Sequence, residues 1–280
     1  MNEFVKRTLS GTIFVGCVVG CILWNQWSVA IMILCISLLA VDEFHRLVQS
    51  HVLQRIYAAL GVIVLWLASV MDSYQVAVAC SIAYLPIIAM SLLDEIWNHS
   101  GKPLQNWGNM LISQCMIALP LLSMRLIYHL DSWLLLALFV LIWVNDTGAY
   151  CVGSLTAKRP QGNHKMAPHI SPKKSWEGLF GGMACAIGAA FILHRFGWFA
   201  SIVPADHGLL ISGLFGLLVS GFGTMGDLME SLFKRSIGVK DSGSFLPGHG
   251  GVLDRFDSIL LATPVLTAYS WICYFIAPLL

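Results

Sequence analysis

Most of the side chains that could do chemistry lie in one charged stretch, from Gly226 to Ser258, of an otherwise apolar chain. The stretch holds Asp227, Glu230, Lys234, Arg235, Lys240, Asp241, His249, Asp254, Arg255 and Asp257. Apolar runs flank it on both sides, and charge beside a bilayer is costly unless a function requires it. Carboxylates bind divalent cations, whereas Lys and Arg bind phosphate oxygens. The stretch predicts a metal–phosphate site; a solvated loop of ion pairs is the alternative.

The spacing of the carboxylates suits a metal ion. If the preceding apolar helix continues, Asp227, Glu230, Ser231 and Lys234 follow one another at i, i+3, i+4 and i+7 and share a face. Asp254 and Asp257 share a face in the same way if their segment is helical. Mg²⁺ prefers a few carboxylates together with water and substrate phosphates. We therefore expect two acidic helix ends to meet around Mg²⁺.

Three shorter segments could contact phosphate or metal. Glycines around His249, in the run from Gly248 to Gly251, permit close backbone approach, and amides near a helix start favour anions. His249 binds phosphate, relays protons or is merely structural. The segment from Ser171 to Gly178 places lysines and hydroxyls at a helix start, which makes it either an anion site or a positive-inside anchor. Asp146 is an isolated carboxylate near the end of an apolar run. It either belongs to a functional site or is a capping or interhelically hydrogen-bonded Asp.

Together these residues resemble the phosphatidate cytidylyltransferase (CDP-diacylglycerol synthase) family. Its long signature, S-x-x-K-R-x4-K-D-x5-P-x-H-G-G-x-x-D-R-x-D, is matched from Ser231 to Asp257. The run from Asn145 to Tyr150 resembles the family's D-[ST]-x-A-Y segment, and Ser171 to Gly178 resembles S-P-x-K-[ST]-x-E-G. Ser175 stands where the family often has Thr, and the loop around Lys158 and Arg159 is a few residues longer than usual, which puts their role in doubt.

The resemblance implies transfer of CMP from CTP to phosphatidate, forming CDP-diacylglycerol and pyrophosphate. It also implies about nine helices, Mg²⁺ with a companion monovalent cation such as K⁺, and a homodimer. On this basis we assign the metal to Asp227 and Asp254, with Asp146 and Asp257 beside it. The groups expected to hold the triphosphate or the lipid headgroup are Ser171, Lys173, Lys174, Ser175, Lys234, Arg235, Lys240, His249, Gly250, Gly251 and Arg255.

The elements that must position these groups are membrane helices. The chain has 280 residues, of which 57% are hydrophobic and 11% charged, against about 25% charged in soluble domains. The apolar runs do not alternate apolar and polar residues as the strands of a membrane barrel would, so they predict an all-α polytopic protein. Nine spans are expected: 8–24, 27–41, 56–70, 75–93, 104–128, 132–152, 176–199, 208–225 and 259–280. Asp42, Glu43, His45, Arg46 and Arg55 are interpreted as a polar connection, with the two acidic residues as interface anchors.

Basic residues predict the orientation. With the N-terminus in the cytoplasm and the C-terminus outside, 14 of the 16 Lys and Arg residues fall on the cytoplasmic side, and only Arg125 and Arg195 fall outside. The charged loops then face one compartment, which we expect to be the cytoplasmic side of a bacterial inner membrane. We expect an N-terminal part of five spans, residues 1–130, and a C-terminal catalytic part of four, residues 131–280.

Other classes of protein fit less well. A net charge of +1 gives no signal for nucleic acid, and eight cysteines within or beside apolar runs, without a CxxC pair, indicate neither a disulfide framework nor a zinc site. A transporter would place its charges near mid-membrane, often with internal repeats. A CTP-dependent polyprenol kinase would release CDP instead of pyrophosphate. The D-G-x-x-A-R motif of CDP-alcohol phosphotransferases is absent.

Overall fold

The computed structural model describes residues 3–71, 73–98, 101–203, 207–243 and 250–277. Eight helices within these ranges are long and apolar enough to cross a membrane, and a shorter apolar helix, Leu9–Trp24, precedes them. The expected all-α polytopic membrane fold is therefore confirmed, and the protein is an integral membrane protein. The orientation of its termini stays a prediction.

The chain divides into two compact units. The first comprises Met1–Arg125 and Val239–Phe256, and the second comprises Leu126–Gly238 and Asp257–Leu280. Two of the three boundaries fall within helices, α7 (Leu119–Leu130) and α11 (Leu253–Ile276), and the third, after Gly238, follows the end of α10 (Gly208–Ser236). Each unit is described separately below.

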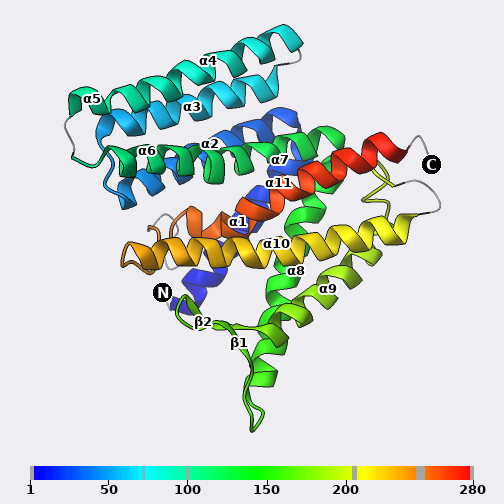
Figure 1. The fold of residues 1–280 in the computed structure, drawn as a ribbon. Helices are drawn as coiled ribbons and strands as arrows, with labels where there is room; N and C mark the ends of the chain where they lie inside the picture. The colour runs from blue at the N-terminus through cyan, green and yellow to red at the C-terminus, as the bar shows by residue number, and fades with distance from the viewer. Residues whose placement is uncertain (1–2, 72, 99–100, 204–206, 244–249, 278–280) are drawn as a thin grey trace. The chain divides into compact units, whose positions relative to one another are not determined.

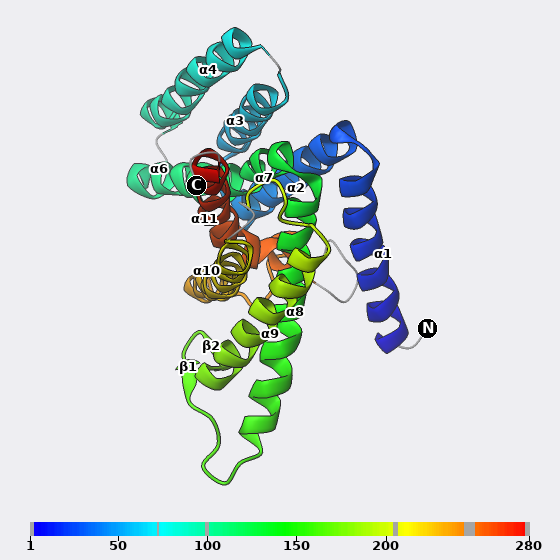
Figure 2. The same ribbon diagram turned by 90° about the vertical axis from the view of Figure 1, so that its right-hand side faces the viewer.

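The first unit is a set of apolar helices with polar links between them. Its elements are α1 (Glu3–Trp24), α2 (Gln26–Leu47), α3 (Val52–Val70), α4 (Tyr74–Leu93), α5 (Glu95–Asn98), α6 (Pro103–Ile112), the π-helix η1 (Ser113–Ala118) and the start of α7. The helices α3 and α4 lie side by side (Figures 1 and 2). Within η1, Ser113 Oγ lies 3.0 Å from Nε2 of the fully buried His45, and Ser50 Oγ lies 2.8 Å from Nδ1 of the same ring. These two hydrogen bonds fix the end of α2.

The second unit is built on α8, α9 and α10. Its elements are α8 (Ser132–Ala157), the antiparallel strands β1 (Lys165–Ala167) and β2 (Ser171–Ser175), α9 (Trp176–Arg195), α10 (Gly208–Ser236) and most of α11. Small residues bring α8 and α9 together: a Cβ at Gly182 would lie 2.7 Å from the carbonyl oxygen of Asn145, and one at Gly148 would lie 2.8 Å from Cys185 Sγ. Such close backbone approach is typical of helix pairs in membranes. Figure 2 shows the two helices packed along each other.

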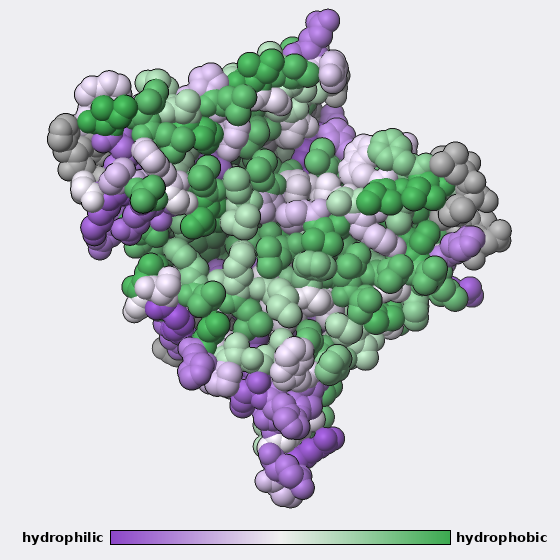
Figure 3. Space-filling view, viewed as in Figure 1, coloured by the Kyte–Doolittle hydropathy of each residue, from purple (hydrophilic) through white to green (hydrophobic). Residues whose placement is uncertain are grey.

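Two details differ from the sequence-based expectations. The helix α2 continues to Leu47, so Asp42, Glu43, His45 and Arg46 lie on its last turns and not in a connection, because they pair with neighbouring groups there. The region from Gly153 to Ser175 is not only a loop, since α8 runs to Ala157 and β1 and β2 form a hairpin. Hydrophilic residues gather where α8 ends and this hairpin begins, whereas hydrophobic ones cover much of α9 and α10 (Figure 3).

Two conditional expectations are confirmed. The helix α10 extends to Ser236, which places Asp227, Glu230, Ser231 and Lys234 on one helix. The helix α11 begins at Leu253, so that Asp254 and Asp257 are one turn apart. Both charged helix ends are thus continuous with apolar segments.

Candidate active site

A cavity of about 360 Å³ in the second unit collects three of the sequence segments singled out above. Asp146 reaches it from α8, Lys173, Lys174 and Ser175 from β2, and Asp227 from α10. The rest of the lining consists of Asn145, Ala149, Tyr150, Met166, Gly178, Leu179 and Thr224. Carboxylates and ammonium groups therefore share one cavity, although they are separated by up to 81 residues in the chain.

An ion pair crosses this cavity. Lys174 Nζ lies 2.6 Å from Asp227 Oδ2 and donates a hydrogen bond of 3.2 Å to the carbonyl oxygen of Thr224. Ser231, one turn further along α10, donates to Asp227 Oδ1 at 3.3 Å. Both carboxylate oxygens of Asp227 thus have a partner, one cationic and one neutral.

Asp146 is held by its neighbour Asn145, which is 3% exposed. Asn145 Nδ2 donates to Asp146 Oδ1 at 3.3 Å, and Asn145 Oδ1 accepts from Ser220 Oγ at 2.5 Å. The buried amide therefore links α8 to α10. Because Gly182 has no side chain, α9 approaches this amide closely. The carboxylate of Asp146 is consequently aimed by the packing of three helices.

A second acidic group lies along α10 and α11. The carboxylate of Asp257 interacts electrostatically with those of Asp227, Glu230 and Asp146. Gly226 permits this closeness, since a Cβ there would lie 2.6 Å from the carbonyl oxygen of Asp257. Glu230, 3% exposed, pairs with Lys234 at 2.5 Å.

These groups leave an excess of negative charge. Asp257 interacts with the carboxylates of Asp146, Asp227 and Glu230, whereas two lysines are paired within the group: Lys174 with Asp227 and Lys234 with Glu230. Buried like charges repel strongly. A group of carboxylates held this close together favours cations nearby.

The remaining predicted anion-binding residues of this unit have distinct local roles. Ser175, 4% exposed, caps α9 by accepting from Gly178 N at 3.1 Å. Lys173 is exposed at the cavity, and Arg235 Nε donates at 3.4 Å to the carbonyl oxygen of Ile170. Ser171 begins β2 opposite Ala167. A cap on Ser175 orders the first turn of α9, whose amides and nearby lysines favour an anion.

In the first unit, two carboxylates hold the start of α11. Glu43 accepts from Val252 N at 2.9 Å, from Leu253 N at 3.0 Å, and from the hydroxyl of Ser242. Asp254 Oδ2 accepts from Ser242 N at 2.8 Å, from Ser242 Oγ at 2.9 Å and from Gly251 N at 2.8 Å. One amide of the run that the sequence assigned to phosphate, Gly251 N, is therefore bonded to a carboxylate of the chain itself.

Glycines make room for these two carboxylates. A Cβ on Gly251 would collide with both Glu43 oxygens, and one on Gly250, at φ +80°, would collide with Asp254 Oδ2. Arg255 and Lys240 are exposed in the same unit. His249, also predicted as a site residue, lies outside the described residues. The structure thus gives Gly250 and Gly251 carboxylates as immediate neighbours, and their predicted contact with phosphate stays a prediction.

Glu43 is the functional candidate that sequence reasoning missed. It was interpreted as an interface anchor because it follows an apolar run beside Asp42. No local pattern connects it with Ser242, which is 199 positions away in the chain. The only available signal was a carboxylate at the end of a span, which is costly without a partner.

The donor chemistry fits Mg²⁺. Within the described ranges, no group of three or more His, Cys, Asp and Glu side chains could hold a metal ion by itself. Mg²⁺, however, usually takes one or two carboxylates and completes its shell with water and phosphate oxygens. Asp146 and Asp227 supply carboxylate oxygens in the cavity, beside Lys173 and Lys174. Asp254, which the sequence also assigned to the metal, belongs to the first unit, where its Oδ2 accepts hydrogen bonds from Ser242 N and Gly251 N.

Comparison with known proteins identifies the family. The model of the cytidylyltransferase family matches residues 5–273, nearly the whole chain. The chain belongs to the cytidylyltransferase family. This membership confirms the resemblance drawn from the signature residues, and it extends the match to the N-terminal helices, which the motifs alone did not cover.

Several curated relatives carry a more specific name. A phosphatidate cytidylyltransferase of Staphylococcus epidermidis is 45% identical over 128 residues, covering 46% of this chain and 45% of the relative. Those of Haemophilus influenzae and Staphylococcus aureus are 42% and 44% identical over 142 and 130 residues, which is 51% and 46% of this chain and 46% and 45% of the relatives. The matches thus span less than half the length of these cytidylyltransferases.

Proposed function

We propose that this protein transfers CMP from CTP to phosphatidate, yielding CDP-diacylglycerol and pyrophosphate. The observation that carries the proposal is the cavity of the second unit, where Asp146, Lys173, Lys174 and Asp227 converge within a membrane protein of the cytidylyltransferase family. The relatives named phosphatidate cytidylyltransferase support the choice of lipid.

The reaction requires no strong general base. An oxygen of the phosphatidate phosphate attacks the α-phosphorus of CTP, the bond from that phosphorus to the bridging oxygen of the β-phosphate breaks, and pyrophosphate leaves. The nucleophile is already an anion, so the barrier is dominated by repulsion between two polyanions. Positioning and electrostatic stabilisation therefore supply the catalysis.

Each group of the cavity has a role in this proposal. When bound, Mg²⁺, with K⁺ as a companion, would neutralise phosphate charge. The residues that the family resemblance assigns to the divalent ion are Asp227 and Asp254, with Asp146 and Asp257 as further candidates. Lys174 exchanges its partner Asp227 for a phosphate oxygen when the nucleotide binds, because a triphosphate carries more charge than one carboxylate. The other cationic and polar groups, Ser171, Lys173, Ser175, Lys234, Arg235, Lys240, His249 and Arg255, bind phosphate oxygens or position those that do.

The setting of the reaction follows from the charge distribution. We place the protein in a bacterial inner membrane with its site on the cytoplasmic side, where CTP is made, as the bias of Lys and Arg favours. We further propose a homodimer, as the family resemblance implies. Light scattering of the purified protein in detergent would measure its mass.

Pyrophosphate release tests the proposed reaction. Purified protein in detergent, given Mg²⁺, CTP and phosphatidate, should release pyrophosphate and form CDP-diacylglycerol, and omission of phosphatidate should abolish both products. Release of CDP with a phosphorylated lipid would instead identify a CTP-dependent lipid kinase. Lipid or ion movement across liposomes without CTP consumption would identify a transporter. Either result would refute the proposal.

A further inference from the structure

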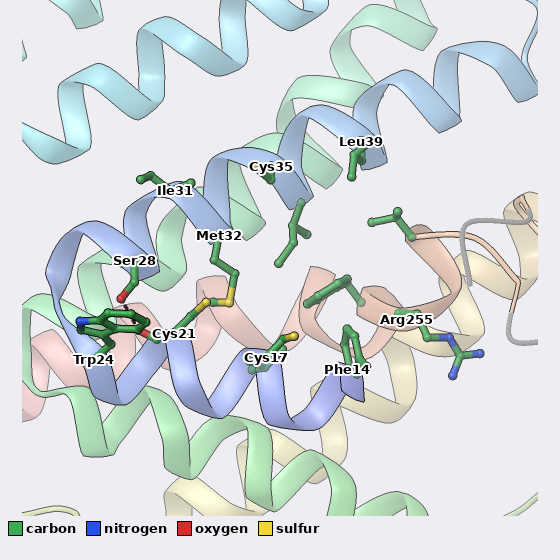
Figure 4. Close-up of a pocket in the computed structure, with 14 residues that line it drawn as sticks. Phe14, Cys17, Cys21, Trp24, Ser28, Ile31, Met32, Cys35, Leu39 and Arg255 are labelled. Carbon is green, nitrogen blue, oxygen red and sulfur yellow. Dashed lines mark hydrogen bonds between the residues drawn. The ribbon is translucent and has the colours of Figure 1, made fainter. Parts of the chain in front are cut away.

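An apolar groove runs along the first unit, separate from the polar cavity described above. It has a volume of about 460 Å³ and is lined by α1, α2 and the start of α11. Phe14, Cys17, Cys21 and Trp24 form the α1 side, with Met32 and Leu39 among those facing them from α2 (Figure 4). This volume is within the range of about 300–1,000 Å³ that is usual for sites of small molecules.

The length of the groove matches one leaflet of a bilayer. Phe14 and Trp24 are ten residues apart on α1, which is about 15 Å at 1.5 Å per residue. The hydrocarbon core of a bilayer is about 30 Å thick, so one leaflet accounts for about 15 Å. A single acyl chain in one leaflet therefore has the length that the groove offers.

Among the side chains that the structure describes, the charge in the groove lies at one end. Arg255 is the one charged side chain among these lining residues, and it lies beside Phe14, away from Trp24 (Figure 4). Arg255 is exposed, and its planar guanidinium matches a phosphate group with two parallel hydrogen bonds. An apolar channel with a cation at one end is complementary to an anionic phospholipid, and not to a neutral lipid.

We propose that this groove binds one acyl chain of an anionic phospholipid whose phosphate contacts Arg255. Under the proposed function, on which this assignment rests for the identity of the lipid, the occupant is phosphatidate. The groove would then fix the depth at which the phosphate lies, because the chain slides only as far as Trp24 allows. Arg255 follows Asp254 directly, so the headgroup would lie next to the turn that Glu43 holds.

Photolabelling of the full-length protein in nanodiscs tests the assignment without requiring turnover. The probe is phosphatidate with a diazirine on one acyl chain, and the reference probe is diacylglycerol with the same chain. Mass spectrometry of the peptides should place the phosphatidate label on the Phe14–Trp24 and Ile31–Leu39 segments. Diacylglycerol, which has no phosphate for Arg255, should label them about tenfold less.

Two substitutions on α1 give a matched pair. Cys17 lines the groove, whereas Val15, also on the surface of α1, does not. Cys17→Trp should displace about two methylene groups of the chain and weaken labelling by roughly tenfold. Val15→Trp adds the same ring outside the groove and should leave labelling unchanged. Arg255→Gln should lower labelling by phosphatidate to the level seen with diacylglycerol.

The outcomes separate this inference from the proposed function. Equal labelling by both probes, or labelling that Cys17→Trp leaves intact, would show that the groove contacts only bulk lipid and would overturn the assignment. Pyrophosphate release by the same preparation would still support the cytidylyltransferase activity. Conversely, selective labelling of the groove without pyrophosphate release would support the lipid-binding site and refute the proposed cytidylyltransferase reaction.

Discussion

Replacing Glu43 by Gln should loosen the turn before α11. The carboxylate accepts three hydrogen bonds, from Val252 N, Leu253 N and the hydroxyl of Ser242. A glutamine keeps one acceptor oxygen but presents an NH₂ group to an N–H donor. One charge-assisted bond is lost and the others weaken, at about 1.5–3 kcal/mol for each bond to a charged group. We therefore expect the turn to lose about 2–3 kcal/mol of local stability.

Hydrogen–deuterium exchange reads this loss directly. A change of about 2–3 kcal/mol corresponds to opening that is roughly 30- to 150-fold more frequent. The amides of Gly251, Val252 and Leu253 should exchange faster by this factor in Glu43→Gln. Under the proposed function, turnover of CTP should also decrease in Glu43→Gln, because Asp254 and Arg255 adjoin these amides.

Asp42→Asn provides the matched control. It removes the same charge from the neighbouring residue of α2, but Asp42 pairs with Arg46 and Arg55 near the surface, at 2.7 and 2.5 Å. Such exposed pairs contribute about 0–1 kcal/mol, so exchange near Val252 should stay at the wild-type rate. Unchanged exchange in Glu43→Gln, or an equal increase in both variants, would refute the reasoning.

Three further predictions follow from the site. Gly250→Ala should lower stability by about 2–4 kcal/mol in thermal unfolding, since the methyl group meets Asp254, whereas Gly238→Ala, at a similar φ of +76° with open space, should cost about 1–2 kcal/mol. Lys174→Ala should reduce kcat/KM for CTP by about 100-fold, while Lys165→Ala on β1, outside the cavity, should retain the wild-type value. EDTA should abolish pyrophosphate release and added Mg²⁺ should restore it; turnover without a divalent ion would refute the metal assignment.

Local sequence was sufficient where hydropathy and signature spacing carried the information. The runs that predicted membrane spans became helices, and α10 and α11 extended as the spacing around Asp227 and Asp254 required. The end of α2 was predicted poorly, because charged residues lower the local hydropathy and were therefore interpreted as a connection between helices. Buried partners override that signal: His45 is fully buried and hydrogen-bonded, and Glu43 caps a distant segment.

The sequence alone determined an all-helical membrane protein of the cytidylyltransferase type, because apolar length and a long motif are both local properties of the chain. Only the tertiary structure decided which carboxylates share a cavity with which lysines, and that the amides at the start of α11 bond to Glu43. These pairings join residues as far as 210 positions apart. Their energies depend on distance and burial, which no single segment specifies until the helices have packed.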